Sequence, residues 1–245
     1  MIGVLGGMGP LATADFFSKV IAASTAARDE EHVPLLIQSD PRIPSRPLAI
    51  LHGGESPLPA LLAGRDRLIR AGATGLAMPC NTAHFWFPQL TEGCNVPFIS
   101  ILQACCDEVA TRVEPGATVG IIATGATLST GLFEKPLKLL GYTVITPSQD
   151  ELETVVSPAI ARVTAGFPAE AGAMLAGSVQ SLLDRGAATV ILACTETPLA
   201  LDAVQSPLRA QCIDSTAALA RACVAWWAAH GDKTSGSAIR INPPD

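Results

Sequence analysis

Apolar residues in this chain fall into short continuous runs that alternate with longer stretches in which they recur every three or four positions. The short runs are rich in Val, Ile and Leu, which is typical of strands buried on both faces of a parallel sheet. These runs lie at 2–5, 33–38, 74–79, 96–101, 118–123, 142–145, 189–193 and 211–213. The longer stretches have the spacing of amphipathic helices, and they lie near 10–27, 58–71, 101–113, 129–140, 150–164, 169–185, 197–204 and 215–229.

The pattern occurs twice along the chain. Residues 68–82 align without a gap on residues 182–196, at an offset of 114, and both segments carry a cysteine at the same place, Cys80 and Cys194. The same offset aligns 98–101 with 212–215. Repetition of a helix end, a glycine, a buried strand and a polar turn is the mark of a duplicated structural unit.

Strands alternating with helices, present in two related copies, predict an α/β fold of two pseudo-symmetric, doubly wound parallel-sheet domains. We expect a first domain of residues 1–98 plus 208–230 and a second of residues 99–207. The C-terminal tail, 231–245, is small, polar and proline-containing, and is expected to be disordered or lightly packed.

Each of the two cysteines directly follows the carboxyl end of a predicted strand. Ligands of open parallel sheets bind beyond the carboxyl ends of the strands, so two such units facing each other form a cleft with Cys80 and Cys194 on opposite walls. A single buried cysteine at a strand end ordinarily has only a packing role. Two at equivalent repeat positions, each followed by polar helix-opening residues, favour a functional site.

Composition supports this fold class and narrows the partner. The chain of 245 residues is 49% hydrophobic, 16% charged and only 4% aromatic, which suits helices packed on parallel strands. A net charge of −6 without any block of Lys and Arg argues against nucleic acid or an anionic membrane as partner, and favours a small molecule.

The cellular setting and metal chemistry follow from simple patterns. The chain begins directly with an apolar run, without a basic leader, and no apolar stretch reaches the length of a membrane span, so we expect a cytoplasmic protein. Its seven cysteines have no zinc-type spacing. Neither a disulfide scaffold nor a metal site is expected.

A glycine-rich loop, residues 6–10, follows the first run and opens the first helix with Pro10. Its backbone amides predict a binding site for carboxylate or phosphate. Residues 7–12 also fit a weak dinucleotide fingerprint, but the next candidate acid, Asp40, lies too far along the chain and precedes a proline. A nicotinamide cofactor is therefore not expected.

Three further side chains are candidates for the cleft. The proline-stiffened segment 38–47 reads as a loop over the cleft and carries Arg42 and Arg46. The fork of Arg46 is a natural partner for a carboxylate, whereas a surface ion pair is the alternative for each arginine. His84 either assists thiolate formation or packs on a helix face.

Taken together, the motifs resemble the aspartate/glutamate racemase family. The resemblance rests on residues 6–10 with Ala12-Thr13, Asp40-Pro41 to Pro44 and Arg46, Pro79 to His84, and Cys194-Thr195-Glu196. It implies a two-domain α/β fold with an interdomain active site, a homodimer, an amino-acid substrate, and no pyridoxal phosphate, other cofactor or metal.

By this resemblance Cys80 and Cys194 are the catalytic acid/base pair of a cofactor-independent racemase acting on aspartate or glutamate. The substrate-binding residues that it implies are Met8, Arg46, Asn81, Thr82, Ala83, Thr124, Thr164 and Thr195. One departure concerns Thr164, which stands where aspartate racemases often carry a lysine that binds the substrate. Glutamate or a broader substrate range is then open.

Other members of the superfamily, hydantoin racemases, maleate isomerases and arylmalonate decarboxylases, are alternatives, although the last need only one cysteine. A non-catalytic dicarboxylate-binding protein is an alternative of another class. The two cysteines favour proton transfer at carbon, since racemisation requires an acid and a base on opposite faces of the reacting atom.

Overall fold

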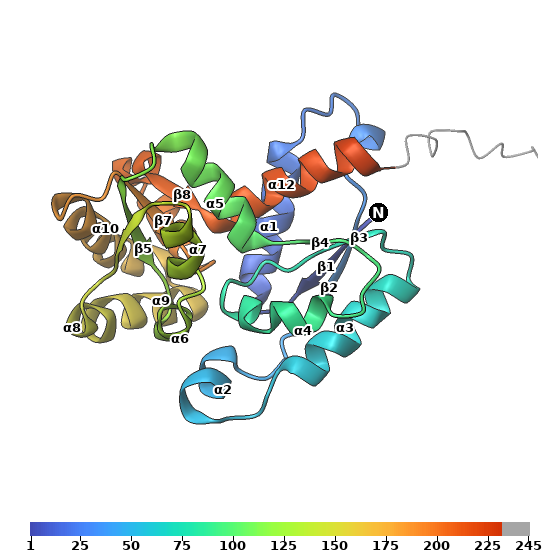
Figure 1. Ribbon diagram of the computed structural model, residues 1–245, viewed down its shortest axis with the longest axis horizontal. Helices are drawn as coiled ribbons and strands as arrows, with labels where there is room; N and C mark the ends of the chain where they lie inside the picture. The colour runs from blue at the N-terminus through green and yellow to red at the C-terminus, as the bar shows by residue number, and fades with distance from the viewer. Residues whose placement is uncertain (232–245) are drawn as a thin grey trace, which may run out of the picture.

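The computed structural model describes residues 1–231, so the expectation for the tail lies outside the described residues apart from Gly231. Two four-stranded parallel sheets form the framework (Figure 1). The first has the order β2-β1-β3-β4 and the second the order β6-β5-β7-β8. The strands are β1 (Ile2–Gly6), β2 (Leu35–Ser39), β3 (Gly75–Ala77), β4 (Phe98–Ile99), β5 (Thr118–Ile122), β6 (Thr143–Ile145), β7 (Thr189–Leu192) and β8 (Cys212–Asp214). The predicted α/β class is confirmed.

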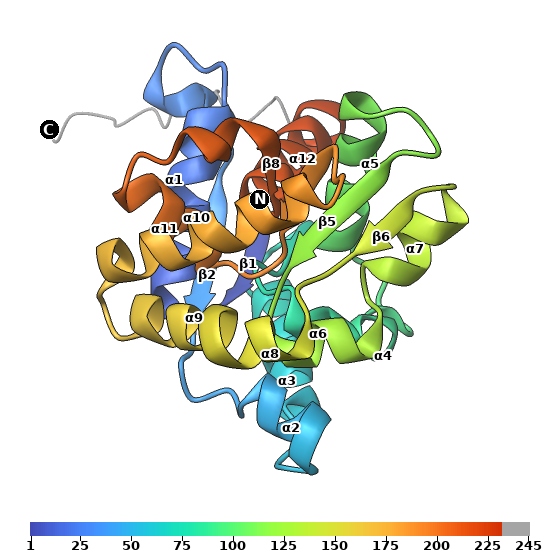
Figure 2. The same ribbon diagram turned by 90° about the vertical axis from the view of Figure 1, so that its left-hand side faces the viewer.

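Helices cover both faces of each sheet (Figure 2). The α-helices are α1 (Pro10–Ala23), α2 (Arg46–His52), α3 (Leu58–Arg70), α4 (Phe87–Thr91), α5 (Ile101–Arg112), α6 (Gly125–Thr130), α7 (Glu134–Leu139), α8 (Gln149–Glu151), α9 (Ser157–Thr164), α10 (Pro168–Asp184), α11 (Thr197–Ala203) and α12 (Ser215–His230). Short 3₁₀ turns occur at η1 (Asp29–Glu31), η2 (Thr82–Trp86) and η4 (Pro207–Gln211), and η3 (Leu152–Val156) is one π turn. Among residues 1–231, none of the helices combines the length and apolar character that crossing a membrane requires.

The two sheets share strand order and register. Gly3 of β1 pairs with Leu76 of β3, and at offsets of 117 and 114 Gly120 of β5 pairs with Val190 of β7. Both glycines lie against equivalent leucines: a Cβ on Gly3 would come within 3.0 Å of Leu68, and one on Gly120 within 3.2 Å of Leu182. The absence of a side chain lets the helix after each sheet's second strand approach the central strand closely. The sequence repeat is therefore a structural repeat.

The fourth strand of each sheet leads into a helix that packs on the other sheet. Helix α5 follows β4, yet its Cys105 and Val109 lie in the core beside β5 and β7. Helix α12 follows β8, yet its Leu219 and Cys223 lie in the core of β1 and α1. The two helices also contact each other. We call this arrangement the helix exchange.

The helix exchange bears on the expected domain division, which stays a prediction. The range 208–230 was assigned to the first domain, and α12 packs there on α1. However, β8 at the start of that range pairs with β7 in the second sheet. A boundary at the end of β8 fits the sheets better than one at residue 208.

Some elements differ from the predicted ones. The segment from Arg46 was expected to be part of a loop, but it forms α2, because Ser45 caps the helix and Pro47 is compatible with a first turn. The expected helix near 129–140 is divided into α6 and α7 by Gly131, whose φ is +68°. The expected helix 150–164 is interrupted by the π turn η3.

Candidate active site

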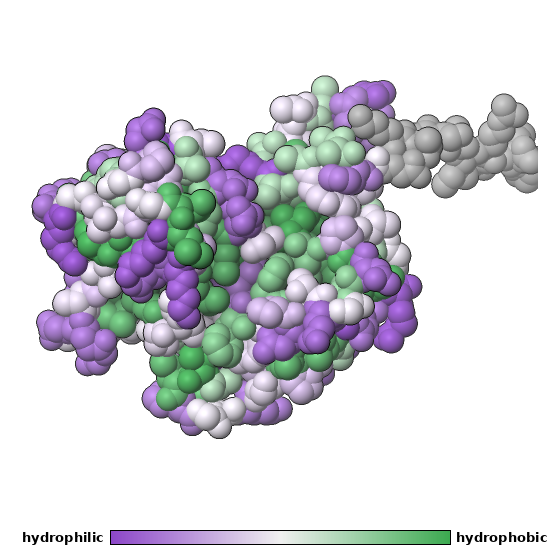
Figure 3. Space-filling model, viewed as in Figure 1, coloured by the Kyte–Doolittle hydropathy of each residue, from purple (hydrophilic) through white to green (hydrophobic). Residues whose placement is uncertain are grey.

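Cys80 and Cys194 line one cleft between the two halves. The cleft has a volume of about 260 Å³ and lies beyond the carboxyl ends of β1, β3 and β7. Its lining residues are Met8, Gly9, Ser45, Arg46, Pro47, Cys80, Asn81, Thr82, Thr124, Ile160, Thr164, Cys194, Thr195 and Glu196. A hollow of about 780 Å³ lies elsewhere, between the end of α1, η1 and α12, and neither cysteine lines it. In the space-filling view a furrow separates the two lobes (Figure 3).

The two cysteine turns are anchored by buried side chains. The carbonyl of Cys194 accepts a hydrogen bond from Thr197 Oγ1 at 2.7 Å, and the carbonyl of Cys80 lies 2.8 Å from His84 Nδ1. His84 Nε2 accepts from the amide of Ile101, so Nδ1 carries the ring proton and donates to Cys80. Burial lowers the pKa of His84 to about 4. Both ring nitrogens of His84 thus have backbone partners, which favours a structural role for it over a role in thiolate formation.

Cys80 faces positive and donor groups. Burial raises the pKa of its thiol above the ordinary value, while the guanidinium of Arg46 and the backbone N–H of Ala83 oppose that shift. The Glu196 carboxylate acts in the same direction as burial, but less strongly. Cys80 is therefore a buried thiol with a cation beside it, a setting that assists ionisation.

Cys194 faces a carboxylate. Its Sγ donates to Glu196 Oε2 at 3.0 Å, and the same oxygen accepts from Thr195 Oγ1 at 2.9 Å. Burial and then the charge of Glu196 raise the pKa of the Cys194 thiol well above its ordinary value. The two cysteines thus occupy equivalent turns with opposite electrostatic partners, a guanidinium beside Cys80 and a carboxylate beside Cys194.

Arg46 reaches the cleft from the first turn of α2. Its Nη1 donates to the carbonyls of Ile43 and Pro44, at 3.0 Å each, which holds the guanidinium in place. Its Nε is buried and has no partner among the described residues. Arg42, in contrast, is exposed and pairs with Asp40 at 2.9 Å. The structure brings Arg46 to the site and leaves Arg42 in a surface ion pair.

The glycine-rich loop reaches the cleft through Met8 and Gly9. Gly7 has a φ of +95°, and a Cβ there would lie 2.3 Å from the amide nitrogen of Asp40. Only glycine allows this approach of the loop to the end of β2. The amide of Gly7 donates to Thr13 Oγ1 of α1 at 2.8 Å, which ties the loop to its helix.

Polar side chains connect the two walls. Thr82 Oγ1 lies 2.8 Å from Thr127 Oγ1 and 3.3 Å from Thr124 Oγ1, and Thr124 caps α6. Beside them Asn81 Nδ2 donates to Ser215 Oγ at 2.9 Å, whereas Asn81 Oδ1 is buried without a partner among the described residues. That oxygen is a buried acceptor whose hydrogen-bonding capacity is unused by these residues.

The sequence identified most of this site. All the expected residues line the cleft except Ala83, whose side chain is fully buried and whose amide faces Cys80. Glu196 belongs to the Cys194-Thr195-Glu196 motif, but sequence reasoning did not include it among the expected site residues. A carboxylate at this position carries its own signal, since the equivalent residue in the first repeat is Thr82. Ser45, Pro47 and Ile160 were also missed and have no signal of their own.

Among the described residues, no three His, Cys, Asp or Glu side chains gather as metal ligands. The charged residues that line the cleft are Arg46 and Glu196. Its chemistry is thus that of two thiols, one guanidinium, one carboxylate and several hydroxyls and amides.

Comparison with known proteins places this geometry in a family. Residues 5–223 match the family described as Asp/Glu/hydantoin racemase. The broad-specificity amino-acid racemase RacX of Bacillus subtilis is 28% identical over 94% of this chain and 99% of its own length.

Solved structures agree with this match. An aspartate racemase from Picrophilus torridus superposes with a TM-score of 0.80 and 28% identity, covering 92% of this chain and 93% of its own. An aspartate racemase homologue from Pyrococcus horikoshii gives a TM-score of 0.74 and 25% identity, over 93% and 98% of the two chains. The resemblance seen in the sequence motifs is confirmed: the chain belongs to the Asp/Glu/hydantoin racemase family.

Proposed function

We propose that this protein is a cofactor-independent racemase that interconverts L- and D-amino acids by proton transfer between Cys80 and Cys194. The observation that carries the proposal is the pair of thiols in equivalent turns lining a single cleft. A racemase needs an acid and a base on opposite faces of the α-carbon, and the pair fits those roles.

The different surroundings of the two thiols support different resting protonation states. Cys80, next to Arg46, is the thiol that loses its proton first, and Cys194 stays protonated while it donates to Glu196. In one direction the Cys80 thiolate takes the α-proton, and the Cys194 thiol delivers its proton to the other face. In the reverse direction the roles exchange. Groups whose surroundings separate their acidities in this way define an acid and a base.

The remaining groups recognise the substrate and stabilise the carbanion. Arg46, held by two backbone carbonyls, is placed to contact a substrate carboxylate, and Asn81 Oδ1 is an acceptor for the α-ammonium. Thr82 and Thr195 also line the cleft and carry hydroxyls. Donors aimed at the carboxylate stabilise negative charge as it develops.

For the substrate we propose aspartate or glutamate within a broader range of amino acids. Names of similar proteins support both parts, since one is a broad-specificity amino-acid racemase and another an aspartate racemase. Thr164 lines the cleft where a lysine would otherwise pair with a distal carboxylate. With Arg46 as the cation that lines the cleft, a second substrate carboxylate has weaker support, which favours breadth over strict selection.

Exchange of the α-hydrogen in D₂O tests the proposal. Each enantiomer of aspartate, glutamate and alanine is supplied without added cofactor, exchange is followed by proton NMR, and inversion by chiral chromatography. We expect exchange with inversion, and its loss in both Cys80→Ala and Cys194→Ala with the fold retained by circular dichroism. Absence of exchange with a panel of all common amino acids would refute the proposal, and normal turnover by either variant would refute the two-thiol mechanism.

A further inference from the structure

Ser215 joins the two cysteine turns. It is the first residue of α12 and is fully buried. Its Oγ donates to the carbonyl of Leu192 at 2.9 Å and accepts from Asn81 Nδ2 at 2.9 Å. Leu192 ends β7 two residues before Cys194, and Asn81 directly follows Cys80. One hydroxyl therefore bonds to the backbone just before the Cys194 turn and to the side-chain amide of the residue that follows Cys80.

The directions of these hydrogen bonds fix the orientation of the Asn81 amide. A carbonyl oxygen can only accept, so the single hydroxyl proton of Ser215 is used on Leu192. The hydroxyl oxygen must then accept from Asn81, and the group of Asn81 that faces it must be the NH₂. As a result Oδ1 points away from Ser215, and it has no partner among the described residues.

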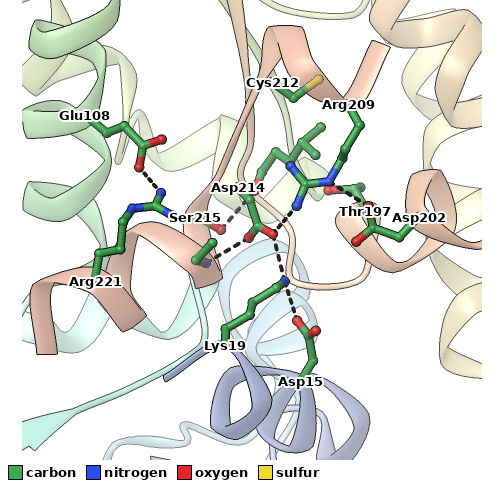
Figure 4. Close-up of polar contacts among 12 residues, drawn as sticks. Asp15, Lys19, Glu108, Thr197, Asp202, Arg209, Cys212, Asp214, Ser215 and Arg221 are labelled. Atoms are coloured by element: carbon green, nitrogen blue, oxygen red, sulfur yellow. Dashed lines mark hydrogen bonds and ion pairs between the residues drawn. The ribbon is translucent and has the colours of Figure 1, made fainter. Parts of the chain in front are cut away.

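The position of Ser215 is itself held from both halves of the molecule. Its neighbour Asp214 caps α12 by accepting from the amide of Ala217 at 3.0 Å. The Asp214 carboxylate also pairs with Lys19 of α1 at 2.7 Å and with Arg209 of η4 at 2.6 Å (Figure 4). The backbone that carries the Ser215 hydroxyl is therefore held in place at the start of α12.

The repeat shows that this contact is not needed for the fold as such. At the offset of 114, Asp214 corresponds to Ser100, and both residues cap the helix that follows. Ser215 corresponds to Ile101, which has no hydroxyl and supplies only its amide to His84. The helix start is thus built equally well without a serine at this position. What the serine adds at this position is the hydrogen bond to the side-chain amide of Asn81.

We propose that Ser215 is a positioning residue, which holds the Asn81 amide with its oxygen toward the cleft and so selects substrates that carry a free ammonium group on the reacting carbon. The inference rests on the proposed function and names the chemistry of its substrate. Without the hydroxyl the amide can turn over, which presents an NH₂ group instead. An ammonium group is then repelled, whereas a 2-hydroxy acid can still accept a hydrogen bond.

The test compares amino acids with their 2-hydroxy analogues as ligands. Aspartate and malate, glutamate and 2-hydroxyglutarate, and alanine and lactate are titrated as protectants of Cys80 against iodoacetamide, with the modified site read by peptide mass spectrometry. We expect the wild-type protein to prefer the amino acid by about tenfold or more, as a hydrogen bond to a charged group allows. In Ser215→Ala this preference should fall to about twofold.

A matched control removes a buried hydroxyl elsewhere. Thr189 Oγ1, at the start of β7, donates to the carbonyl of Gln211 at 3.0 Å and is likewise buried. Thr189→Val should reduce stability, as Ser215→Ala does, but keep the wild-type ligand preference. In a second background, Asn81→Ala, adding Ser215→Ala should change the preference by less than about twofold, since its effect acts through Asn81.

The outcomes separate the two proposals. If Ser215→Ala keeps the wild-type preference, or loses it equally with and without Asn81, the positioning role is refuted while the racemase proposal stands. If neither amino acids nor hydroxy acids protect Cys80 in the wild-type protein, the proposed function fails first. Ligand preference is a ratio within one variant, so loss of stability alone does not change it.

Discussion

At the scale of single residues, the site contains two copies of one cysteine turn, and the two copies have neighbours of opposite charge. Cys80 and Cys194 were evident in the sequence because the repeat alignment places them at the same position. Their unequal surroundings were not evident. Arg46 comes from a helix that the hydrophobic pattern did not predict, and spacing alone cannot show that Glu196 turns back onto the preceding thiol.

Glu196→Gln should make Cys194 more acidic. The carboxylate raises the pKa of this thiol, both by its charge and by accepting the thiol proton, so an uncharged amide should lower that pKa. Alkylation by iodoacetamide, followed against pH for each cysteine by mass spectrometry, measures the shift. The midpoint for Cys194 should move to lower pH, and Cys80, on which Glu196 has a smaller effect, should move less. An unmoved Cys194 midpoint would contradict this electrostatic assignment.

Thr164→Lys should sharpen selection for dicarboxylic substrates. Thr164 lines the cleft at the end of α9, where an ammonium group is also favoured by the helix dipole. We expect the KM for aspartate to fall roughly threefold to tenfold, with that for alanine little changed. Thr164→Met, of similar length but uncharged, is the control. An equal fall for both substrates, or the same fall with methionine, would show that charge is not the cause.

At the scale of elements, the strands were the most predictable part. All eight expected strands are present, because runs of Val, Ile and Leu have few other uses in an α/β chain. The helices around the cleft were harder. Helix α2 begins at a proline-rich segment, and α6 is short and capped by Thr124, so neither shows the long apolar period that identifies a core-facing helix.

The paired glycines of the central strands allow a matched experiment on packing. A Cβ on Gly3 would lie 2.8 Å from that of Ala73, whereas one on Gly120 comes no closer than 3.1 Å to any neighbour, the nearest being Val190. Gly3→Ala should therefore lower the free energy of unfolding by about 1–3 kcal/mol through overpacking, and Gly120→Ala by less. Urea denaturation of both variants measures the difference. Equal losses would show that the packing around Gly3 is no tighter than the packing around Gly120.

At the scale of the whole molecule, charged residues hold the two halves together at the start of α12. Asp214 is nearly fully buried, and burial alone raises the pKa of its carboxyl, but Lys19 and Arg209 outweigh this and hold the pKa below its ordinary value (Figure 4). The pKa of Asp15 is raised instead, because its burial outweighs the nearby Lys19. Asp214 is thus the carboxylate that stabilises the folded form of this cluster.

Asp214→Asn should lower the free energy of unfolding by about 2–3 kcal/mol at neutral pH. A depressed folded-state pKa gives stability that is present above the unfolded value, about 4, and lost as the pH falls through the folded one. The gap in melting temperature between wild type and variant should therefore close on acidification below about pH 4. Calorimetry across this range measures the gap. A gap that is constant with pH would show that the charge of Asp214 is not what stabilises the fold.

The sequence predicted two related α/β units, and the expected domain ranges put the last helix with the first unit and residues 99–113 with the second. The duplicated strands and the carboxyl-end cleft follow from periodicity and from the rules of parallel sheets. Periodicity by itself does not show the helix exchange, because an apolar helix face does not indicate which of two similar sheets it covers. Only the packing of Cys105 beside β5 and of Leu219 beside β1 decides it.

The helix exchange also means that the gene's two repeats are not two separable parts of the protein. A break after α5 leaves the first sheet without α12 and the second sheet without α5, so neither piece is a complete folding unit. The two pieces are instead complementary, each supplying the helix that the other lacks. An ancestor with one repeat could satisfy the same pattern only as a pair of chains, each lending its last helix to the other.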